Sequence, residues 1–274
     1  MESRVDRANG TYVYGVIAGP PSRLRRAAGR RSKSSLPGTG PVRLIALEGD
    51  LHAVVADAPL RLYGQEALAR KLSDLEWVSR AAVAHETVLE SFADAAAVVP
   101  MKLFTLFTSD DRALAHLRAE HRRIDATVKR VAHHHEFGVR VILDRRPVAS
   151  APGRTAGRPT GLSYLKEKKA QRDLTRELAV RAGETVDGLF DRLASRATLA
   201  KRRPASELSA GGGRLLLDAA FLVSRSKARA FGSAVAREMR SLGRDGYAIT
   251  MTGPWPPYSF IDPGTASSPA SAQD

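Results

Sequence analysis

The sequence contains no cysteine, and aromatic residues make up only 6% of its 274 residues. The lack of cysteine excludes disulfide bonds, thiolate catalysis and zinc sites with cysteine ligands. It is also typical of a reducing compartment, so we expect a cytoplasmic protein. No stretch approaches the ~20 apolar residues of a membrane-spanning helix, and residues 1–6 lack the apolar centre of a secretion signal. The sequence therefore predicts neither a membrane span nor export.

Acidic residues are also in short supply: 29 Asp and Glu stand against 43 Lys and Arg, which gives a net charge of +14. Such a field favours nucleic acid, an anionic membrane or an acidic protein partner, and it also keeps a chain soluble. Part of the excess lies in residues 19–40, where arginines among Pro, Ser, Gly and Ala predict a solvated loop. The alternative for this segment is a loop that binds polyanions. Residues 145–159, rich in Pro, Gly and Arg, predict a second surface loop.

Apolar residues are plentiful, at 43% of the chain, and suffice to build hydrophobic cores. Because single domains are usually ~100–150 residues long, we expect two compact units. The order of the predicted elements indicates an α+β fold, with a modified ferredoxin-like sheet-and-helix unit first and a helix-rich α+β unit second. The predicted segments are a disordered N-terminus (1–10), the ferredoxin-like unit (11–132), the second unit (133–262) and a disordered tail (263–274).

The first unit is expected to start with a central strand over residues 11–18, which are apolar on both faces. A hairpin follows, with strands over 42–47 and 51–56 joined at Gly49. A helix begins after Asp74 and carries apolar or small residues at spacings of three and four, interrupted only by His85. That stripe comprises Leu75, Val78, Ala82, Leu89, Phe92 and Ala96.

The helix ends before a β-branched and aromatic run, residues 98–107, which predicts a strand with Pro100 near its start or at an edge. Ser109 then caps a further helix that has Asp110 in its first turn. The apolar side of this helix includes His121. Its other members are Leu114, Leu117, Ile124, Val128 and Val131.

The second unit is expected to contain strands over residues 137–144, 214–223 and 247–252 and a helix over 226–242. Between the first two strands, a helical tract runs from about Gly161 to Lys201. Its apolar stripe comprises Leu174, Leu178, Ala182, Val186, Leu189, Leu193 and Ala197. Gly183 and Gly188 weaken the middle of this tract by up to ~1 kcal/mol each relative to alanine, so we expect a bend or a break there.

Histidines are the residues whose pattern suggests catalysis or metal binding. Residues 133–135 are all histidine, but adjacent side chains point in different directions and no further ligand converges on them, so we expect a surface turn. His85 and His121 lie on apolar stripes without an assignable nucleophile or orienting carboxylate. This favours hydrogen-bonded core residues over general bases. The sequence predicts no catalytic, cofactor-binding or metal-binding residue.

The segment from Gly253 to Phe260 is the most distinctive in the chain. Prolines around Trp255 fix the backbone and predict a stiff, extended arm that carries Trp255, Tyr258 and Phe260. The favoured interpretation is that these rings pack on the protein's own sheet and close the second unit. The alternative is that they anchor a partner, and they are the candidate partner contacts.

Four stretches of the sequence are similar to one known family. They are Tyr12–Gly15, His85–Glu90, Val98–Asp111 and Thr252–Phe260. The family that they resemble is gas vesicle protein L/F (GvpL/GvpF), and the likeness spans roughly residues 11–261. At one point the chain departs from the family pattern. After Pro100 the family has an apolar residue, a basic residue and Phe-Gly-Thr, whereas this chain has Leu103-Phe104-Thr105 at the last three positions.

The resemblance implies a non-enzymatic accessory protein of gas vesicle formation, which binds the small amphipathic shell protein and other gas vesicle proteins. It implies a modified ferredoxin fold followed by a helix-rich domain, no cofactor, no specific nucleic acid partner, and a cytoplasmic location in association with the vesicle. It does not fix an oligomeric state. Two rivals stay open. One is a basic nucleic-acid-binding α+β module, although no strand carries the aromatic stacking motif of RNA-recognition domains. The other is an enzyme, which would have a pocket lined by His85 or His121 together with carboxylates.

Overall fold

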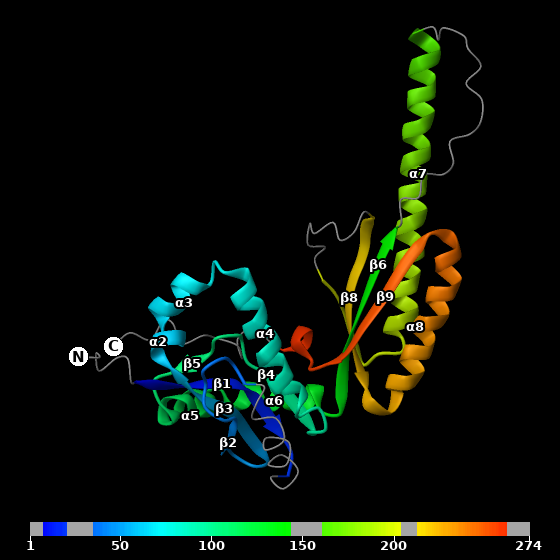
Figure 1. Ribbon diagram of the computed structural model, residues 1–274. Coiled ribbons are helices and arrows are strands. Elements are labelled where there is room, and N and C mark those ends of the chain that lie inside the picture. Colours follow the sequence, from blue (N-terminus) through cyan, green and yellow to red (C-terminus); the bar gives the residue numbers. More distant parts are fainter. Residues whose placement is uncertain (1–7, 21–34, 144–160, 204–212, 262–274) are drawn as a thin grey trace. The chain divides into compact units, whose positions relative to one another are not determined.

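The structure is a computed structural model that describes residues 8–20, 35–143, 161–203 and 213–261 (Figure 1). Most of the predicted 19–40 loop, the 145–159 loop and both ends of the chain lie outside these residues. The chain divides into two compact units, one formed by Met1–Glu136 with Pro254–Asp274 and the other by Phe137–Gly253. The segment that begins at Pro254 therefore groups with the first unit, although the sequence placed it in the second.

The sheet of the first unit is built around β1 (Asn9–Ala18). On one side β1 pairs antiparallel with β3 (Leu51–Pro59), which in turn pairs with β2 (Arg43–Ala46). On the other side β1 pairs antiparallel with β4 (Ala97–Pro100) and β5 (Leu106–Phe107). Every residue of β1 after the first is buried, which confirms the predicted central strand with apolar residues on both faces.

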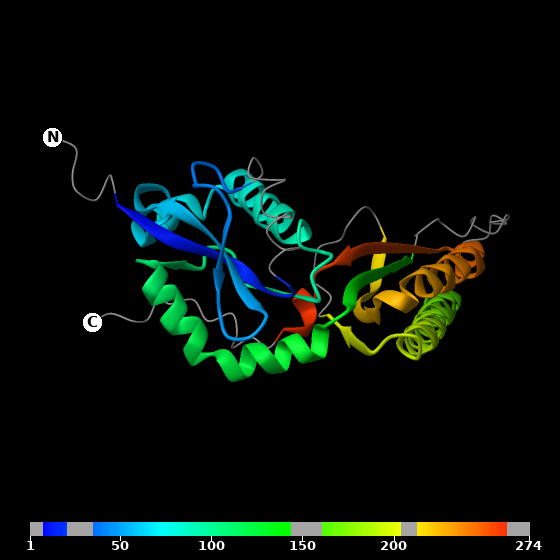
Figure 2. The ribbon, with the colours of Figure 1, turned by 90° about the horizontal axis from the view of Figure 1, so that it is seen from below.

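Helices cover both faces of this sheet (Figure 2). One face carries α2 (Leu60–Tyr63), α3 (Gln65–Lys71) and α4 (Leu75–Glu90), and the other carries α5 (Asp110–Ala119) and α6 (His121–Val131). Both predicted N-caps are confirmed. The Asp74 carboxylate accepts a hydrogen bond from the Trp77 N–H, and the Ser109 hydroxyl oxygen accepts one from the Arg112 N–H.

The helix after Asp74 is shorter than predicted, and its buried side is different. α4 ends at Glu90, and its buried residues are Ala81, His85, Val88 and Leu89. Leu75, which was predicted to lie on the inner stripe, is 80% exposed. The chain turns after Glu90 because β4 must start beside β1 at Ala97, which pairs with Ala18.

Two further elements of this unit are interrupted. The predicted strand over 98–107 is split, since β4 ends at Pro100 and the turn before β5 holds Phe104 at a φ of 67°. Pro100 is the last residue of an edge strand, where its missing N–H costs little. The helix that starts after Ser109 breaks at Glu120 into α5 and α6, so that its buried residues become Ala113, Leu117, Ile124, Thr127 and Val131.

The sheet of the second unit has the strand order β7-β8-β6-β9. These strands are β6 (His134–Leu143), β7 (Leu199–Arg202), β8 (Arg214–Ser224) and β9 (Tyr247–Trp255). The helices α7 (Gly161–Ala194) and α8 (Ala228–Leu242) share one core with β6, β8 and β9 (Figure 1). Short 3-10 turns occupy Arg225–Lys227, Gly243–Asp245 and Tyr258–Phe260. The predicted α+β class with two sheet-and-helix units is confirmed.

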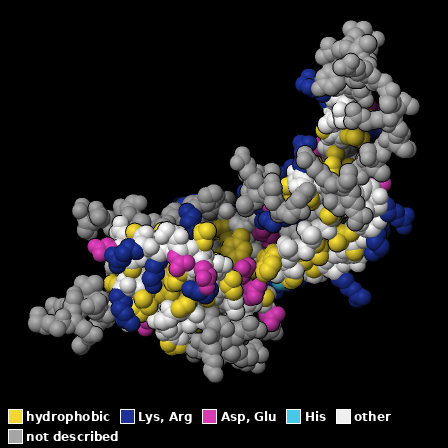
Figure 3. Space-filling view, turned by 45° about the horizontal axis from the view of Figure 1, so that its top comes forward, with side chains coloured by type: hydrophobic (Ala, Val, Ile, Leu, Met, Phe, Trp, Pro, Cys, Tyr) yellow, Lys and Arg dark blue, Asp and Glu magenta, His cyan; other side chains and the backbone are white. Residues whose placement is uncertain are grey.

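The long helix of this unit differs from its prediction in three ways. α7 ends at Ala194 rather than near Lys201, and the residues after it form the strand β7, which the sequence did not predict. It runs without a break through Gly183 and Gly188. Its apolar stripe is buried only from Ala182 onward, whereas Leu174 and Leu178 are 57% and 53% exposed. Figure 3 shows hydrophobic side chains at the surface of this part of α7.

Candidate partner-binding surface

The large hydrophobic side chains that the first unit exposes are concentrated on and just before α4. Leu75 is 80% exposed, Val83 is 60% exposed, and Leu72, at the end of α3, is 52% exposed. Leu75, Ser79 and Val83 follow each other at intervals of four residues, so they form a stripe on the side of α4 opposite the core. We call Leu72, Leu75, Ser79, Val83 and Thr87 the α4 surface.

A shallow groove of about 370 Å³ runs over the second half of this surface. Its lining consists of Ser79, Arg80, Val83, Ala84 and Thr87 from α4 and of Ser35 from another part of the chain. The Thr87 hydroxyl donates to the Val83 carbonyl oxygen, 2.8 Å away, so this polar group is satisfied within the helix. The groove therefore combines the apolar surface of Val83 and Ala84 with hydroxyl groups and with the guanidinium of Arg80.

Aromatic side chains hold the first turns of α4 from beneath. The Trp77 ring stacks on the Phe104 ring with their centroids 5.3 Å apart and an interplanar angle of 10°. Tyr63 packs against the same indole, and the Lys71 ammonium lies 4.9 Å from the centre of its ring. These contacts fix the start of the helix on which Leu75 is displayed.

The middle of α4 is fixed by a buried hydrogen bond between Tyr12 and His85. The Tyr12 hydroxyl lies 2.7 Å from His85 Nδ1 and accepts a hydrogen bond of 3.1 Å from the Phe104 N–H. Because the hydroxyl hydrogen is free to point to Nδ1, the network assigns the imidazole proton to Nε2. Sequence reasoning therefore placed His85 correctly, as a hydrogen-bonded core residue.

Burial lowers the pKa of His85 to about 4. A weak contact with the backbone of Met101 offsets part of this shift, although Nε2 makes no hydrogen bond of good geometry. Burial also raises the pKa of the Tyr12 hydroxyl well above its usual range. Both groups are therefore neutral at neutral pH, and neither is arranged as an acid or a base beside an open site.

Phe104 is the residue that stands where the resembled family pattern has glycine. Its φ of 67° lies in the left-handed region, which costs a side chain with a Cβ roughly 1–2 kcal/mol. Two contacts hold this conformation: the hydrogen bond from its N–H to Tyr12 and the stacking of its ring on Trp77. The departure from the family pattern thus keeps the glycine-like backbone and adds a ring beneath α4.

The three candidate contacts of the aromatic arm lie in different environments. Phe260 is buried, Trp255 at the end of β9 is half-buried, and Tyr258 is 39% exposed. The pKa of Tyr258 is raised by partial burial of its hydroxyl and by the carboxylates of Glu86 and Glu90 on α4, so its hydroxyl lies near the last turns of that helix. Of the three rings, Tyr258 is the one that the structure leaves most accessible.

The arm is fastened to the first unit by Glu136, which is itself buried. The Ser259 N–H and the Ser259 hydroxyl each donate to the Glu136 carboxylate, both at 2.7 Å. The favoured interpretation placed this arm in the second unit, whereas Pro254 onward groups with the first unit, and Trp255 is also the last residue of β9. A single sequence gives no signal for this pairing, since the two residues are 123 positions apart.

The remaining histidines do not form a site among the described residues. His121 was predicted to lie in the core, but its side chain is 40% exposed and its Nε2 lies 3.6 Å from the Glu48 carboxylate. The helix break at Glu120 turns it away from the core. His133 occupies an exposed turn with a φ of 59°, and the next two histidines begin β6. Within the described residues, no three His, Asp or Glu side chains are placed to hold a metal ion.

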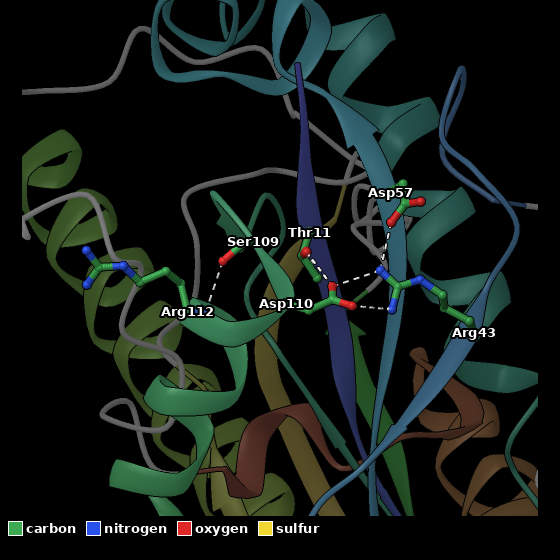
Figure 4. A network of polar contacts seen from close by, with 6 residues as sticks. All are labelled: Thr11, Arg43, Asp57, Ser109, Asp110 and Arg112. Atoms are coloured by element: carbon green, nitrogen blue, oxygen red, sulfur yellow. Dashed lines mark hydrogen bonds and ion pairs between the residues drawn. The ribbon is translucent and has the colours of Figure 1, made fainter. Parts of the chain in front are cut away.

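A polar network at the start of α5 is structural (Figure 4). The Arg43 guanidinium donates to both oxygens of the Asp110 carboxylate at 2.8 Å and to Asp57 at 2.7 Å. The Thr11 hydroxyl also donates to Asp110, and the hydrogen bonds from Arg43 lower the pKa of this carboxyl. The network ties α5 to β1, β2 and β3, and its charges are paired with one another.

The chain matches known proteins over most of its length. The family model for the gas vesicle synthesis protein GvpL/GvpF matches residues 10–262. Gas vesicle protein F of Streptomyces sp. (strain CB03234) is 30% identical over 270 residues, which cover 92% of this chain and 99% of that one. Gas vesicle protein L of the same organism is 28% identical over 229 residues, covering 81% and 84%.

A solved structure shares the fold. The crystal structure of the gas vesicle protein GvpF from Anabaena sp. PCC7120 superimposes with a TM-score of 0.63 at 16% identity, covering 93% of this chain and 97% of that one. No helix among the described residues is long and apolar enough to span a membrane.

Proposed function

Because the chain belongs to the gas vesicle synthesis protein GvpL/GvpF family, its role concerns gas vesicles, and we propose that it is a non-enzymatic assembly factor that binds the shell protein. In this proposal the α4 surface receives an apolar face of the small amphipathic shell protein before that protein joins the growing shell. Other gas vesicle proteins are further partners. The protein then acts in the cytoplasm, at the vesicle under construction.

The observation that carries the proposal is the joint exposure of Leu72, just before α4, and of Leu75 and Val83 on α4, a helix whose opposite side is held by buried contacts. Hydrophobic side chains exposed together, rather than singly, mark interaction sites. The hydrogen bond between His85 and Tyr12 fixes the helix before a partner arrives, so little conformational entropy is lost on binding.

The size of the surface favours reversible binding. Burial of Leu75 or Val83 contributes ~1.5–3 kcal/mol each, and part of that is offset by the loss of translational and rotational freedom on association. A complex of this kind dissociates readily, as required of a factor that delivers a subunit to a polymer. Tyr258, beside the last turns of α4, adds an aromatic contact at the end of the same helix.

A pull-down of purified shell protein tests the proposal. The variant Leu75→Lys/Val83→Lys places two charges on the α4 surface, and it is expected to lose the shell protein that the unaltered chain retains. The matched control is Leu174→Lys/Leu178→Lys, which makes the same change at exposed leucines of α7 and is expected to retain it. Trp255→Ala and Tyr258→Ala test the aromatic arm separately.

Two outcomes would contradict this proposal. If the unaltered chain retains no shell protein, the protein is not a shell-binding factor. If the α4 variant and the α7 control bind equally well, the shell protein does not use the α4 surface.

A further inference from the structure

A separate feature of the second unit is a cleft between the end of α7 and α8. Its volume is about 270 Å³, and its lining includes the arginines Arg192, Arg196 and Arg237 and one carboxylate, Glu238. The buried residues Leu193 and Ala234 form its apolar floor. Three positive charges against one negative charge make the cleft a site for anions, and it lies in the unit that does not carry the α4 surface.

The single carboxylate of the cleft is already engaged. Arg192 Nε donates to Glu238 Oε1 and Arg192 Nη2 donates to Glu238 Oε2, both at 2.9 Å, so the pair is bidentate and links α7 to α8. The hydrogen bonds from Arg192, helped by the charges of Arg237 and Arg196, hold the pKa of Glu238 below its usual range. Glu238 therefore stays ionised, and the bridge keeps the two walls of the cleft together.

The other two arginines are available. Both Arg196 and Arg237 are exposed, and among the described residues neither forms an ion pair with a carboxylate. Arg196 lies two residues after the end of α7, and Arg237 precedes Glu238 on α8. Each can therefore offer donors to a group that enters the cleft from outside, beside a bridge that is already formed.

The chemistry of the site favours a carboxylate over a phosphate. Arg196 lies just after the C-terminus of α7, where the free carbonyl groups carry a partial negative charge that disfavours a dianion. Phosphate sites commonly use the N–H groups of a helix N-terminus, and the lining of this cleft contains none. The apolar floor suits the methylene groups of an Asp or Glu side chain, and the guanidinium fork fits a carboxylate.

We propose that this cleft binds side-chain carboxylates from an acidic segment of a protein partner, with Arg196 and Arg237 as the donors. The partner's carboxylates would be bound by arginine in the same way as Glu238 is bound by Arg192. The residues of the site belong to the second unit, whereas the α4 surface belongs to the first.

Fluorescence anisotropy with a labelled, glutamate-rich peptide tests this assignment, and the same peptide with Gln in place of Glu serves as the negative probe. Arg196→Gln/Arg237→Gln is expected to weaken binding of the Glu peptide by about tenfold or more, because two charge-assisted hydrogen-bonding groups are lost. The matched control is Arg229→Gln/Arg240→Gln, which removes two exposed charges from α8 outside the cleft. It is expected to weaken binding by about threefold or less, since it changes only the screened long-range field.

Glu238→Gln gives a test with the opposite sign. The Gln amide oxygen can still accept a hydrogen bond from Arg192 and so hold the two helices together, but the competing negative charge is gone. The Glu peptide is therefore expected to bind about threefold more tightly rather than more weakly. Melting curves measured by circular dichroism show whether each variant is folded.

Two outcomes would contradict the proposal. Equal losses of peptide affinity in the cleft variant and the α8 control would overturn the site, because the peptide would then respond only to net charge. Saturable binding of pyrophosphate that depends on Arg196 and Arg237, without binding of the Glu peptide, would overturn the choice of carboxylate.

Discussion

The long helices α4 and α7 are held in their units in different ways. α4 has 16 residues and is about 24 Å long, shorter than the ~33 Å of the ten-residue strand β1 in the sheet beneath it. α7 has 34 residues and is about 51 Å long, longer than the ~36 Å of the eleven-residue strand β8. α4 can therefore rest on its sheet along its whole length, whereas α7 cannot.

The difference shows that an amphipathic stripe marks where a helix is able to pack, while the extent of the surface beneath it decides where it does pack. Leu174 and Leu178 continue the stripe of α7 but lie beyond the part that shares the core. On α4 the buried residues include aliphatic side chains, but also His85, which is hydrogen-bonded to Tyr12. On α7 the buried residues Val186, Leu189 and Leu193 are all aliphatic.

The largest expected effect separates the two parts of α7. Leu189→Ala removes a fully buried side chain and is expected to lower the free energy of unfolding of the second unit by ~2–5 kcal/mol, because it leaves a cavity. Leu178→Ala, on the same helix, is expected to change it by less than ~0.5 kcal/mol. Thermal and urea unfolding measured by circular dichroism compare the two. A large loss for Leu178→Ala would show that the first part of α7 is packed after all.

The second prediction concerns pH and the core beneath α4. Because the pKa of His85 is lowered from 6.5 to about 4 in the folded state, the unfolded chain takes up the proton first as the pH falls. Stability is therefore unaffected by His85 above about pH 6.5 and is lost between about pH 6.5 and pH 4, by up to ~3 kcal/mol.

The control for this prediction is His85→Gln, which keeps a hydrogen-bond acceptor for Tyr12 and cannot titrate. Urea unfolding is followed by tryptophan fluorescence, because Trp77 lies in the first turn of α4 and packs against Tyr63 and Phe104. The variant is expected to lose less stability than the unaltered chain between pH 6.5 and pH 4. Parallel pH profiles for the two chains would contradict the assignment of a neutral, buried His85.

The smallest effect tests the turn that supports α4. Replacing Phe104 by either Ala or Gly removes the stacking on Trp77, so both variants are expected to be less stable than the unaltered chain. Because φ at this position is 67°, Gly is expected to be more stable than Ala by ~1 kcal/mol, the reverse of the usual order. The same fluorescence measurement decides the order. If Ala is the more stable of the two, the left-handed conformation does not persist in the variants.

Local signals predicted much of the fold. Three kinds of feature depend only on residues close together in the sequence, and all are confirmed. They are the apolar run of β1, the hairpin at Gly49 and the helix caps Asp74 and Ser109. β7 was missed because Leu199–Arg202 has no strand pattern of its own and becomes a strand only by pairing with β8. The break at Glu120 was missed because the apolar spacing continues across it, and His121 was misplaced as a result.

The candidate site was harder to predict than the fold. The stripe assigned from the sequence began at Leu75, and this rotated the inner side of α4 away from its true centre near His85. A helical wheel whose inner side is centred on Ala81, His85 and Leu89 places Leu75 and Val83 on the outer side. The sequence therefore did contain a pattern that could have predicted their exposure. The arginine cleft had no such signal, since α7 and α8 bring its residues together from positions about 40 apart.

The hydrogen bonds between Glu136 and Ser259 affect the order in which the two units can fold during synthesis. The first unit is discontinuous in the sequence, because all of Phe137–Gly253 is made between its two parts. As the polypeptide leaves the ribosome, the Glu136 carboxylate has no Ser259 to bind until the residues of the second unit have been translated. The second unit is complete before then, so the part of the protein that is encoded first is the last to be finished.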